Sequence, residues 1–329
     1  MSTPNPILKV EGLKKYFAVT RGIIFSKTLG YIKAVDEVSL KIQKGETLGV
    51  VGESGCGKTT LGRVILQNIR ADGGSVLYAG KDITKLSDKE LLPYRQKIQM
   101  VFQDPYSSLN PRKTIGNAIA EPLIAHGVER EKKELKRQVM EILTTVGLAD
   151  FHYDRYPHEF SGGQRQRIGF ARSLILRPEL LIADEPVSAL DVSIQAQILN
   201  MMEFLQEKFG LTYIFITHDL GVVRHICNRV GVMYLGKFVE IAEVEELFEN
   251  PLHPYTDALL SAVPIPDPEM SRKRILLEGD VPSPFNPPPG CRFFPRCARG
   301  IDICQKDQPL LEEVASNHLV ACYRAKERN

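Results

Sequence analysis

Residues 52–60 are Gly52-Glu53-Ser54-Gly55-Cys56-Gly57-Lys58-Thr59-Thr60, and they fit the pattern G-x-x-x-x-G-K-[ST] at every fixed position. Glycines in such a loop let backbone N–H groups close on a polyphosphate, where a Cβ atom would collide with it. The lysine supplies a point charge for the outer phosphates, and the next hydroxyl can ligate Mg²⁺. We therefore expect all nine residues to contact a bound nucleotide.

The segments on either side of this loop support the same interpretation. Glu46–Val51 is predicted to be a buried strand that leads into the loop, and Thr59–Gln67 a helix that leaves it. The N-terminus of that helix would add roughly half a positive charge where the phosphates lie.

The composition is that of an ordinary soluble globular protein. Of the 329 residues, 43% are hydrophobic and 25% are charged, and the formal net charge is +2. This balance gives no reason to expect a nucleic-acid partner. No run of 18 apolar residues occurs, and residues 1–6 lack the layout of a signal peptide, so we expect an intracellular protein with no membrane span.

The order of predicted elements indicates an α/β fold. Residues 7–90 are β-rich, residues 114–160 are helical, and helices then alternate with strands. The runs Leu180–Ala183 and Tyr213–Ile216 have no polar alternation, which is typical of strands buried on both faces of a parallel sheet. Beyond about residue 250 the chain becomes proline-rich and then cysteine-rich, which predicts a stiff linker and a separate tail.

Two carboxylates follow the buried run at Leu180–Ala183. Ligand sites of open α/β sheets lie at the carboxyl ends of strands, so Asp184 is placed to hold Mg²⁺, directly or through water. Glu185 can then polarise a water molecule for attack on the γ-phosphate. The alternative is that the pair only caps a turn at Pro186.

A second helix start in the chain has the character of an anion site. Residues 161–164 are Ser161-Gly162-Gly163-Gln164, a small hydroxyl and two glycines at the start of a predicted helix. A bound nucleotide needs only one such helix N-terminus from its own subunit. We therefore expect this end to face the nucleotide held by another subunit, the alternative being a simple serine cap.

Together these motifs resemble those of ATP-binding-cassette (ABC) ATPases. Gly52–Thr60 is similar to the Walker A motif, Leu180–Glu185 to Walker B, and Ser161–Gln164 to the family signature, with Phe160 in place of the usual leucine. The resemblance implies a role for five further residues: Gln103 as the glutamine that senses Mg²⁺ and touches the membrane partner, Asp191 in the D-loop, His218 as the switch histidine, and Tyr16, or else Phe17, as the adenine-stacking aromatic.

The resemblance assigns catalysis to Glu185, His218 and Gln103, and Mg²⁺ ligation to Thr59, Gln103 and Asp184. It implies a P-loop NTPase core with an N-terminal antiparallel β subdomain. The ATPase domain is predicted over residues 7–250, with a helical subdomain at about 105–165. Residues 251–329 are predicted to form the linker and a cysteine-containing extension.

Three stretches resemble the ATP-binding subunits of oligopeptide and dipeptide permeases more closely: Val51–Lys58, Phe102–Arg112 and His253–Thr256. This likeness implies ATP-driven import at the cytoplasmic face of the membrane, with two transmembrane permease subunits and an extracytoplasmic solute-binding protein. The insertion at Thr20–Ile32 is similar to the type that is paired with a second, non-identical ATPase subunit. The substrate could also be an oligosaccharide or a nickel complex. An alternative of another class is a soluble ABC-type switch or clamp.

Four of the six cysteines fall in the tail, at Cys291, Cys297, Cys304 and Cys322, and are separated by five, six and seventeen residues. Four thiolates suit zinc or an iron–sulfur cluster, and the spacing alone does not decide between them. The resemblance implies a 4Fe-4S cluster, which is the expectation we adopt. Zinc, a redox-sensing role and free thiols are the alternatives, and disulfides are disfavoured in a reducing compartment.

Overall fold

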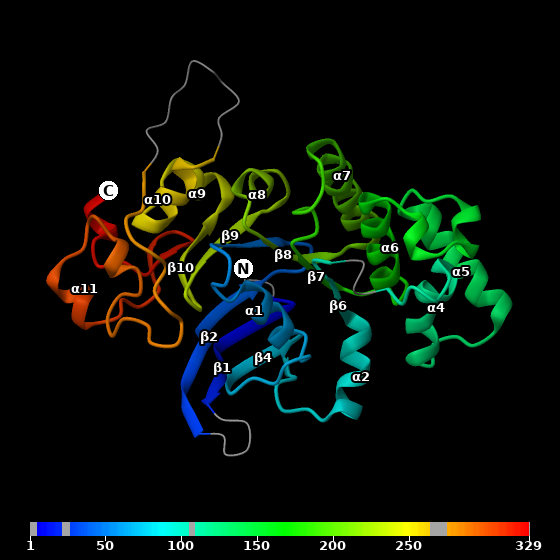
Figure 1. The fold of residues 1–329 in the computed structure, drawn as a ribbon, viewed down its shortest axis with the longest axis horizontal. Coiled ribbons are helices and arrows are strands. Elements are labelled where there is room, and N and C mark those ends of the chain that lie inside the picture. Colours follow the sequence, from blue (N-terminus) through cyan, green and yellow to red (C-terminus); the bar gives the residue numbers. More distant parts are fainter. Residues whose placement is uncertain (1–4, 22–26, 105–108, 264–274, 329) are drawn as a thin grey trace. The chain divides into compact units, whose positions relative to one another are not determined.

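The structure is a computed structural model that describes residues 5–21, 27–104, 109–263 and 275–328 (Figure 1). Parts of the Thr20–Ile32 insertion, the Phe102–Arg112 stretch and the proline-rich linker lie outside these residues. The chain forms two compact units, the first from residues 1–43, 47–84 and 217–329 and the second from 44–46 and 85–216. No helix among the described residues has the length and apolar composition needed to span a bilayer.

The first unit contains the predicted antiparallel β subdomain. Its strands are β1 (Leu8–Arg21), β2 (Lys27–Ile42), β4 (Gly73–Tyr78) and β5 (Lys81–Asp82), in the order β2-β1-β4-β5. The long β1–β2 hairpin is the blue ribbon in Figure 1. Leu8, Val10 and Leu13 are fully buried on the inner face, which ties β1 to the core of this unit.

Five further strands among the described residues of the first unit include the one that leads into the predicted phosphate-binding loop, residues 52–60. They are β3 (Thr47–Val51), β9 (Arg229–Tyr234), β10 (Lys237–Glu243), β12 (His318–Val320) and β11 (Glu312–Ala315), in the order β11-β12-β10-β9-β3. β3 and β9 are parallel, and the remaining pairs are antiparallel. The helices are α1 (Lys58–Ile65), α8 (Leu220–Ile226), α9 (Val244–Glu249), α10 (Pro254–Ser261) and α11 (Asp302–Lys306), with 3₁₀ turns η3 (Phe294–Arg296) and η4 (Ala325–Arg328).

The second unit has a parallel sheet covered by helices. Its strands are β6 (Ile98–Val101), β7 (Leu180–Asp184) and β8 (Thr212–Thr217), and every residue of β7 and β8 is buried, as their unbroken apolar runs predict. The helices are α2 (Asp88–Lys97), α4 (Ile115–Ala125), α5 (Lys132–Thr145), α6 (Gly162–Leu174) and α7 (Val192–Phe209), with 3₁₀ turns η1 (Asp150–Asp154) and η2 (Pro157–Glu159). Gly147, with φ 78°, ends the α5 region in the left-handed conformation that favours glycine.

The tail adds strands β12 and β11 to the sheet of the first unit, which the sequence did not predict. Val320 pairs with Glu240 of β10, and the red C-terminal segment lies beside β10 in Figure 1. Glu240 is fully buried, and its carboxylate accepts the backbone N–H groups of Leu252 (2.7 Å) and His253 (3.0 Å). The ring of the fully buried His318 lies 2.7 Å from the same carboxylate. This cluster joins β10, the start of α10 and β12.

The charge on His318 is set by two carboxylates. Burial lowers its pKa, but the hydrogen bond and charge of Glu240, with Glu246 at 3.4 Å, hold the pKa of His318 above its ordinary value. When the pKa of a histidine is higher in the folded state than in the unfolded state, its protonation stabilises the fold. This contribution is complete at pH values below the unfolded pKa. That contribution is lost as the pH rises through the folded pKa.

We therefore expect the free energy of unfolding of the full chain to fall as the pH rises from about 6.5. His318→Gln keeps a hydrogen-bond donor toward Glu240 but does not titrate in this range. The measurement is urea unfolding at a series of pH values, and the difference between wild type and variant should shrink with rising pH. Parallel profiles for the two proteins would contradict the role given to this pair.

Candidate functional site

The phosphate-binding loop connects β3 to α1, as predicted. Gly52, Gly55 and Gly57 have φ values of 151°, 78° and 110°, a region in which residues with a Cβ are strained. A Cβ at Gly52 would lie 2.1 Å from the carbonyl oxygen of Met233, and one at Gly57 would lie 2.0 Å from that of Ala34. Glycine is needed at both positions because neighbouring backbone leaves no room.

Inside this loop the side chain of Lys58 turns back toward the backbone. Its ammonium donates to the carbonyl oxygens of Gly52 (2.7 Å) and Glu53 (3.1 Å), and the residue is only 5% exposed. Ser54 and Gly55 are exposed at the tip of the loop. The loop thus combines a buried cation, an open tip and a helix N-terminus at Gly57, which is the chemistry that a polyphosphate requires.

The two candidate aromatics for adenine stacking differ in their surroundings. Tyr16 is half-buried, its hydroxyl donates to the carboxylate of Asp36, and the ammonium of Lys33 lies 5.8 Å from its ring centroid. Phe17 is 38% exposed, with Lys15 at 5.5 Å from its ring centroid. Only Tyr16 is fixed by a hydrogen bond, and the choice between the two stays a prediction.

In the second unit, β7 delivers the predicted carboxylates. Asp184 is the last residue of the strand and is 1% exposed. Glu185 has φ 47°, an uncommon conformation for a residue with a Cβ, and its N–H donates to the carbonyl oxygen of Ile216 at 2.9 Å. Strain of this kind clusters at functional sites. The side-chain amide of Gln103 donates to the Glu185 carboxylate at 2.9 Å, so the structure brings these two predicted residues together.

The predicted signature segment forms the N-terminus of α6. The Ser161 hydroxyl accepts the N–H of Gln164 (3.4 Å), and the Gln164 side chain accepts the N–H of Ser161 (3.0 Å), which is a capping box. A Cβ at Gly163 would lie 2.5 Å from the Ile194 side chain. The serine therefore does cap the helix, and Gly163 lets the helix start pack against α7. A role in binding nucleotide from another subunit remains a prediction.

Two further predicted residues also lie at the starts of helices. Asp191 is exposed and immediately precedes α7, and its carbonyl oxygen accepts the N–H groups of Ile194 and Gln195. In the first unit His218 is exposed and lies between β8 and the start of α8.

Sequence reasoning missed three side chains that contact the phosphate-binding loop or its surroundings. The Tyr255 hydroxyl accepts the N–H of Glu53 at 2.9 Å, and the Arg296 guanidinium pairs with the Glu53 carboxylate at 2.8 Å. The buried Arg292 pairs with Asp36. The only signal for Tyr255 was the stretch His253–Thr256, one of the three that resemble peptide permeases. The arginines gave none, because their partners lie more than 240 positions away.

Comparisons with known proteins agree with this geometry. The family model "ABC transporter" matches residues 35–188, and the model "Oligopeptide/dipeptide transporter, C-terminal region" matches residues 239–304. The oligopeptide transport ATP-binding protein AppF of Bacillus subtilis is 55% identical over 320 residues, covering 96% of this chain and 97% of that protein. The dipeptide transport ATP-binding protein DppF of Escherichia coli is 50% identical over 319 residues, covering 97% and 94%.

The chain belongs to the ABC transporter family. Among solved structures, the dimeric ATP-binding cassette MJ0796 bound to ADP and phosphate has a TM-score of 0.64 at 28% identity, covering 72% of this chain and 98% of that one. The predictions of an ABC ATPase and of its fold class are thereby confirmed.

The prediction of a 4Fe-4S cluster in this ABC ATPase is wrong. Among the described residues, which include all four tail cysteines, no group of histidine, cysteine or acidic side chains is arranged to hold a metal ion. The cysteines are free thiols. Burial raises the pKa of Cys291 to about 11 and also raises the pKa of Cys297 and of Cys322.

Three of these cysteines have defined contacts in the fold. The N–H of Cys291 donates to the carbonyl oxygen of Cys304 at 2.7 Å, which closes the loop between them. Cys322 packs against a small apolar cluster that contains Leu252 and Val320.

The close contact at Gly57 of the ABC ATPase loop can be tested by a matched pair of substitutions, with Gly55 as the position that has no close neighbour. Gly57→Ala should lower the free energy of unfolding by about 3 kcal/mol, because left-handed strain adds to a clash with Ala34. Gly55→Ala, where no atom lies within 4 Å of the added Cβ, should cost only about 1 kcal/mol. Urea unfolding measures both, and equal losses would contradict the contact argument.

Proposed function

We propose that this chain binds and hydrolyses ATP as the energising subunit of an importer for dipeptides or oligopeptides. The observation that carries the proposal is that one chain joins the glycine-shaped loop at Gly52–Thr60 to the C-terminal region of the oligopeptide/dipeptide transporter model at residues 239–304. The names of relatives with 50–55% identity over nearly the whole chain support the same activity. No described feature favours the soluble switch or clamp.

Each residue of the proposed ATP site contributes a defined chemistry. Lys58 and the loop N–H groups would hold the phosphates, and Tyr16 would stack on adenine. Thr59, Asp184 and Gln103 offer only oxygen ligands, which suit Mg²⁺, and the ion would neutralise charge on the β- and γ-phosphates. Glu185, oriented by Gln103 at 2.9 Å, would accept a proton from the attacking water.

Two such chains, or this chain and a non-identical ATPase subunit, would share each nucleotide. The helix start at Ser161–Gln164 would face the γ-phosphate held by the partner's loop, with Asp191 and His218 completing the site. The γ-phosphate would draw the two subunits together, and hydrolysis would release them. This exchange of closed and open states is the step that could drive transport.

The remaining partners follow from the same proposal. Two transmembrane permease subunits would carry the substrate path, and a solute-binding protein on the far side would deliver the substrate. This chain would then act at the cytoplasmic face of the membrane, in contact with the permeases through the segment after Gln103. The names of the relatives, which are ATP-binding proteins of oligopeptide transport, support this division of roles.

Removing the proposed general base should separate binding from chemistry. Glu185→Gln should lower the ATPase rate by at least about 100-fold and leave the affinity for ATP within about two-fold, because the amide keeps the shape but cannot accept the proton. Steady-state hydrolysis and equilibrium binding measure the two effects. Glu179→Gln, at a surface residue paired with Lys97, is the control and should change neither. Retained hydrolysis in Glu185→Gln would contradict the assignment.

The substrate class can be tested in the reconstituted transporter. With the permeases and the solute-binding protein present, dipeptides or oligopeptides should stimulate ATP hydrolysis. Oligosaccharides and nickel complexes at equal concentration should not. Stimulation by either of these and not by peptides would replace the peptide assignment while leaving the ATPase intact.

A further inference from the structure

Two arginines of the C-terminal extension (residues 251–329) flank the 3₁₀ turn η3 and reach two different parts of the nucleotide-binding unit. Arg292 precedes the turn and pairs with Asp36, and Arg296 ends it and pairs with Glu53. The two side chains are only 6% and 8% exposed. Buried arginines need partners, so these contacts fix where the turn lies.

The contact of Arg296 holds the phosphate-binding loop at a single residue, Glu53. Arg296 makes two hydrogen bonds to the Glu53 carboxylate, at 2.8 and 3.2 Å, a bidentate geometry that fixes orientation as well as distance. The hydroxyl of Tyr255, a fully buried residue, accepts the N–H of Glu53 at 2.9 Å. The Glu53 carbonyl oxygen accepts from Lys58 (3.1 Å) and from the N–H of Cys56 (3.3 Å). Glu53 therefore links the extension to the phosphate-binding lysine.

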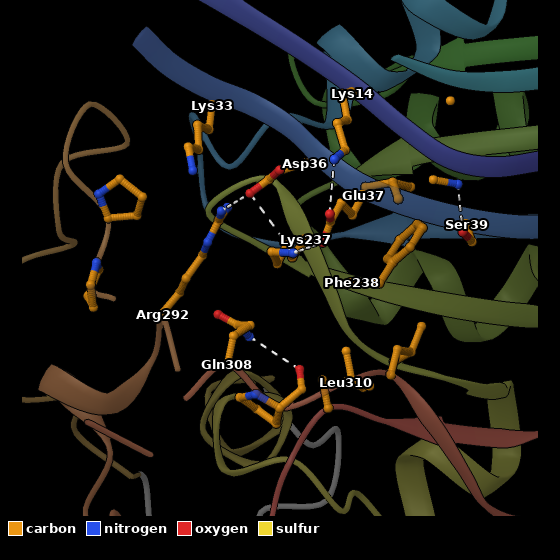
Figure 2. Close-up of a pocket in the computed structure, with 18 of the residues that line it drawn as sticks. Lys14, Lys33, Asp36, Glu37, Ser39, Lys237, Phe238, Arg292, Gln308 and Leu310 are labelled. Carbon is orange, nitrogen blue, oxygen red and sulfur yellow. Dashed lines mark hydrogen bonds and ion pairs between the residues drawn. The ribbon is translucent and has the colours of Figure 1, made fainter. Parts of the chain in front are cut away.

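The contact of Arg292 leads, through Asp36, to the tyrosine proposed to stack on adenine. Arg292 donates to the carboxylate of Asp36 and to the carbonyl oxygen of Leu235, and Asp36 accepts the hydroxyl of Tyr16. Figure 2 shows the Asp36 carboxylate between Arg292 and Lys237, and all three residues line a pocket of about 1170 Å³. Burial raises the pKa of Asp36, but Tyr16, Arg292 and Lys237 together hold it below the ordinary value, so the carboxylate stays charged.

The two contacts are joined by a packed aromatic cluster. The ring of Phe293, which is 1% exposed, lies 5.4 Å from the rings of both Tyr234 and Tyr255. The ring of His253 lies 5.6 Å from it. Burial lowers the pKa of His253 to about 4, so the ring is neutral and its Nδ1 accepts the N–H of Tyr255 at 3.1 Å. Rigid packing of this kind transmits position from one contact to the other.

We propose that the C-terminal extension is a positioning element of the ATP site, in which Tyr255 and Arg296 fix the phosphate-binding loop and Arg292 fixes Tyr16 through Asp36. This inference rests on the ATP site of the proposed function. The argument is one of preorganisation: a loop that samples other conformations binds its ligand in proportion to the fraction that is competent. The extension would raise that fraction without touching ATP, so its residues are positioning residues.

The cleanest variant is Tyr255→Phe, which removes one hydroxyl and keeps the ring packed against Phe293. We expect the dissociation constant of the full chain for a fluorescent ATP analogue to rise about 5-fold, the effect of one hydrogen bond. The KM for ATP of the assembled transporter should rise by a similar factor, while kcat stays within about two-fold. Arg296→Gln should behave alike, and Arg296→Lys should restore part of the loss because it keeps the charge but not the bidentate geometry.

The control is Arg324→Gln, at an arginine of the same extension that pairs with Glu327 instead. It should change neither the dissociation constant nor the KM.

The contact through Asp36 is tested at Tyr16. Tyr16→Phe keeps the ring but loses the hydrogen bond to Asp36, and it should weaken binding of the ATP analogue about 3-fold. The contact with the loop is tested by a double variant. The protein with both Glu53→Gln and Arg296→Gln should bind the ATP analogue no more weakly than Arg296→Gln alone, because both changes remove the same ion pair.

The inference is overturned if Tyr255→Phe and Arg296→Gln, shown to be folded by thermal melting, keep the wild-type dissociation constant and KM. It is also overturned if Arg324→Gln weakens binding as much, since the effect would then be a general loss of stability. Should Arg296→Gln fail to fold, Tyr255→Phe decides alone. Wild-type protein that neither binds nor hydrolyses ATP would instead refute the proposed function, and the two failures are therefore distinguishable.

Discussion

The structure depends first on two places where backbone meets backbone around the phosphate-binding loop. The carbonyl oxygens of Met233 and Ala34 lie where a Cβ at Gly52 or Gly57 would be. The loop is thus shaped from outside, by the end of β9 and by β2, as much as by its own sequence. These strands fix the backbone of the loop. The backbone in turn places the helix N-terminus, the buried lysine and the exposed tip.

The C-terminal extension is part of the same core rather than an appendage. Glu240 is a buried carboxylate whose partners are the N–H groups of Leu252 and His253 and the ring of His318. A buried charge without such partners would be strongly destabilising. The strand that precedes the extension therefore requires it, and the extension in turn reaches the loop through Tyr255 and Arg296.

The sequence predicts what is decided locally. The motif at Gly52–Thr60, the unbroken apolar run of β7 and the capping residues of α6 each carry their own signal, and each forms the expected element. The contacts of Arg292 and Arg296 carry none, because their partners lie 256 and 243 positions away. The tail cysteines misled for a related reason: their number is visible in the sequence, but their arrangement in the fold, which forms no metal-binding group among the described residues, is not.

The position of His318 along the chain has a consequence for biosynthesis. Glu240 leaves the ribosome 78 residues before His318 does, which at ordinary rates of synthesis is about 4 to 16 s. During that interval the edge of β10 lacks the strand that covers it, and its carboxylate lacks the imidazole. An inward-pointing charge on an open edge discourages pairing with a foreign strand. The same glutamate that anchors the finished sheet would thus protect the nascent polypeptide from aggregation.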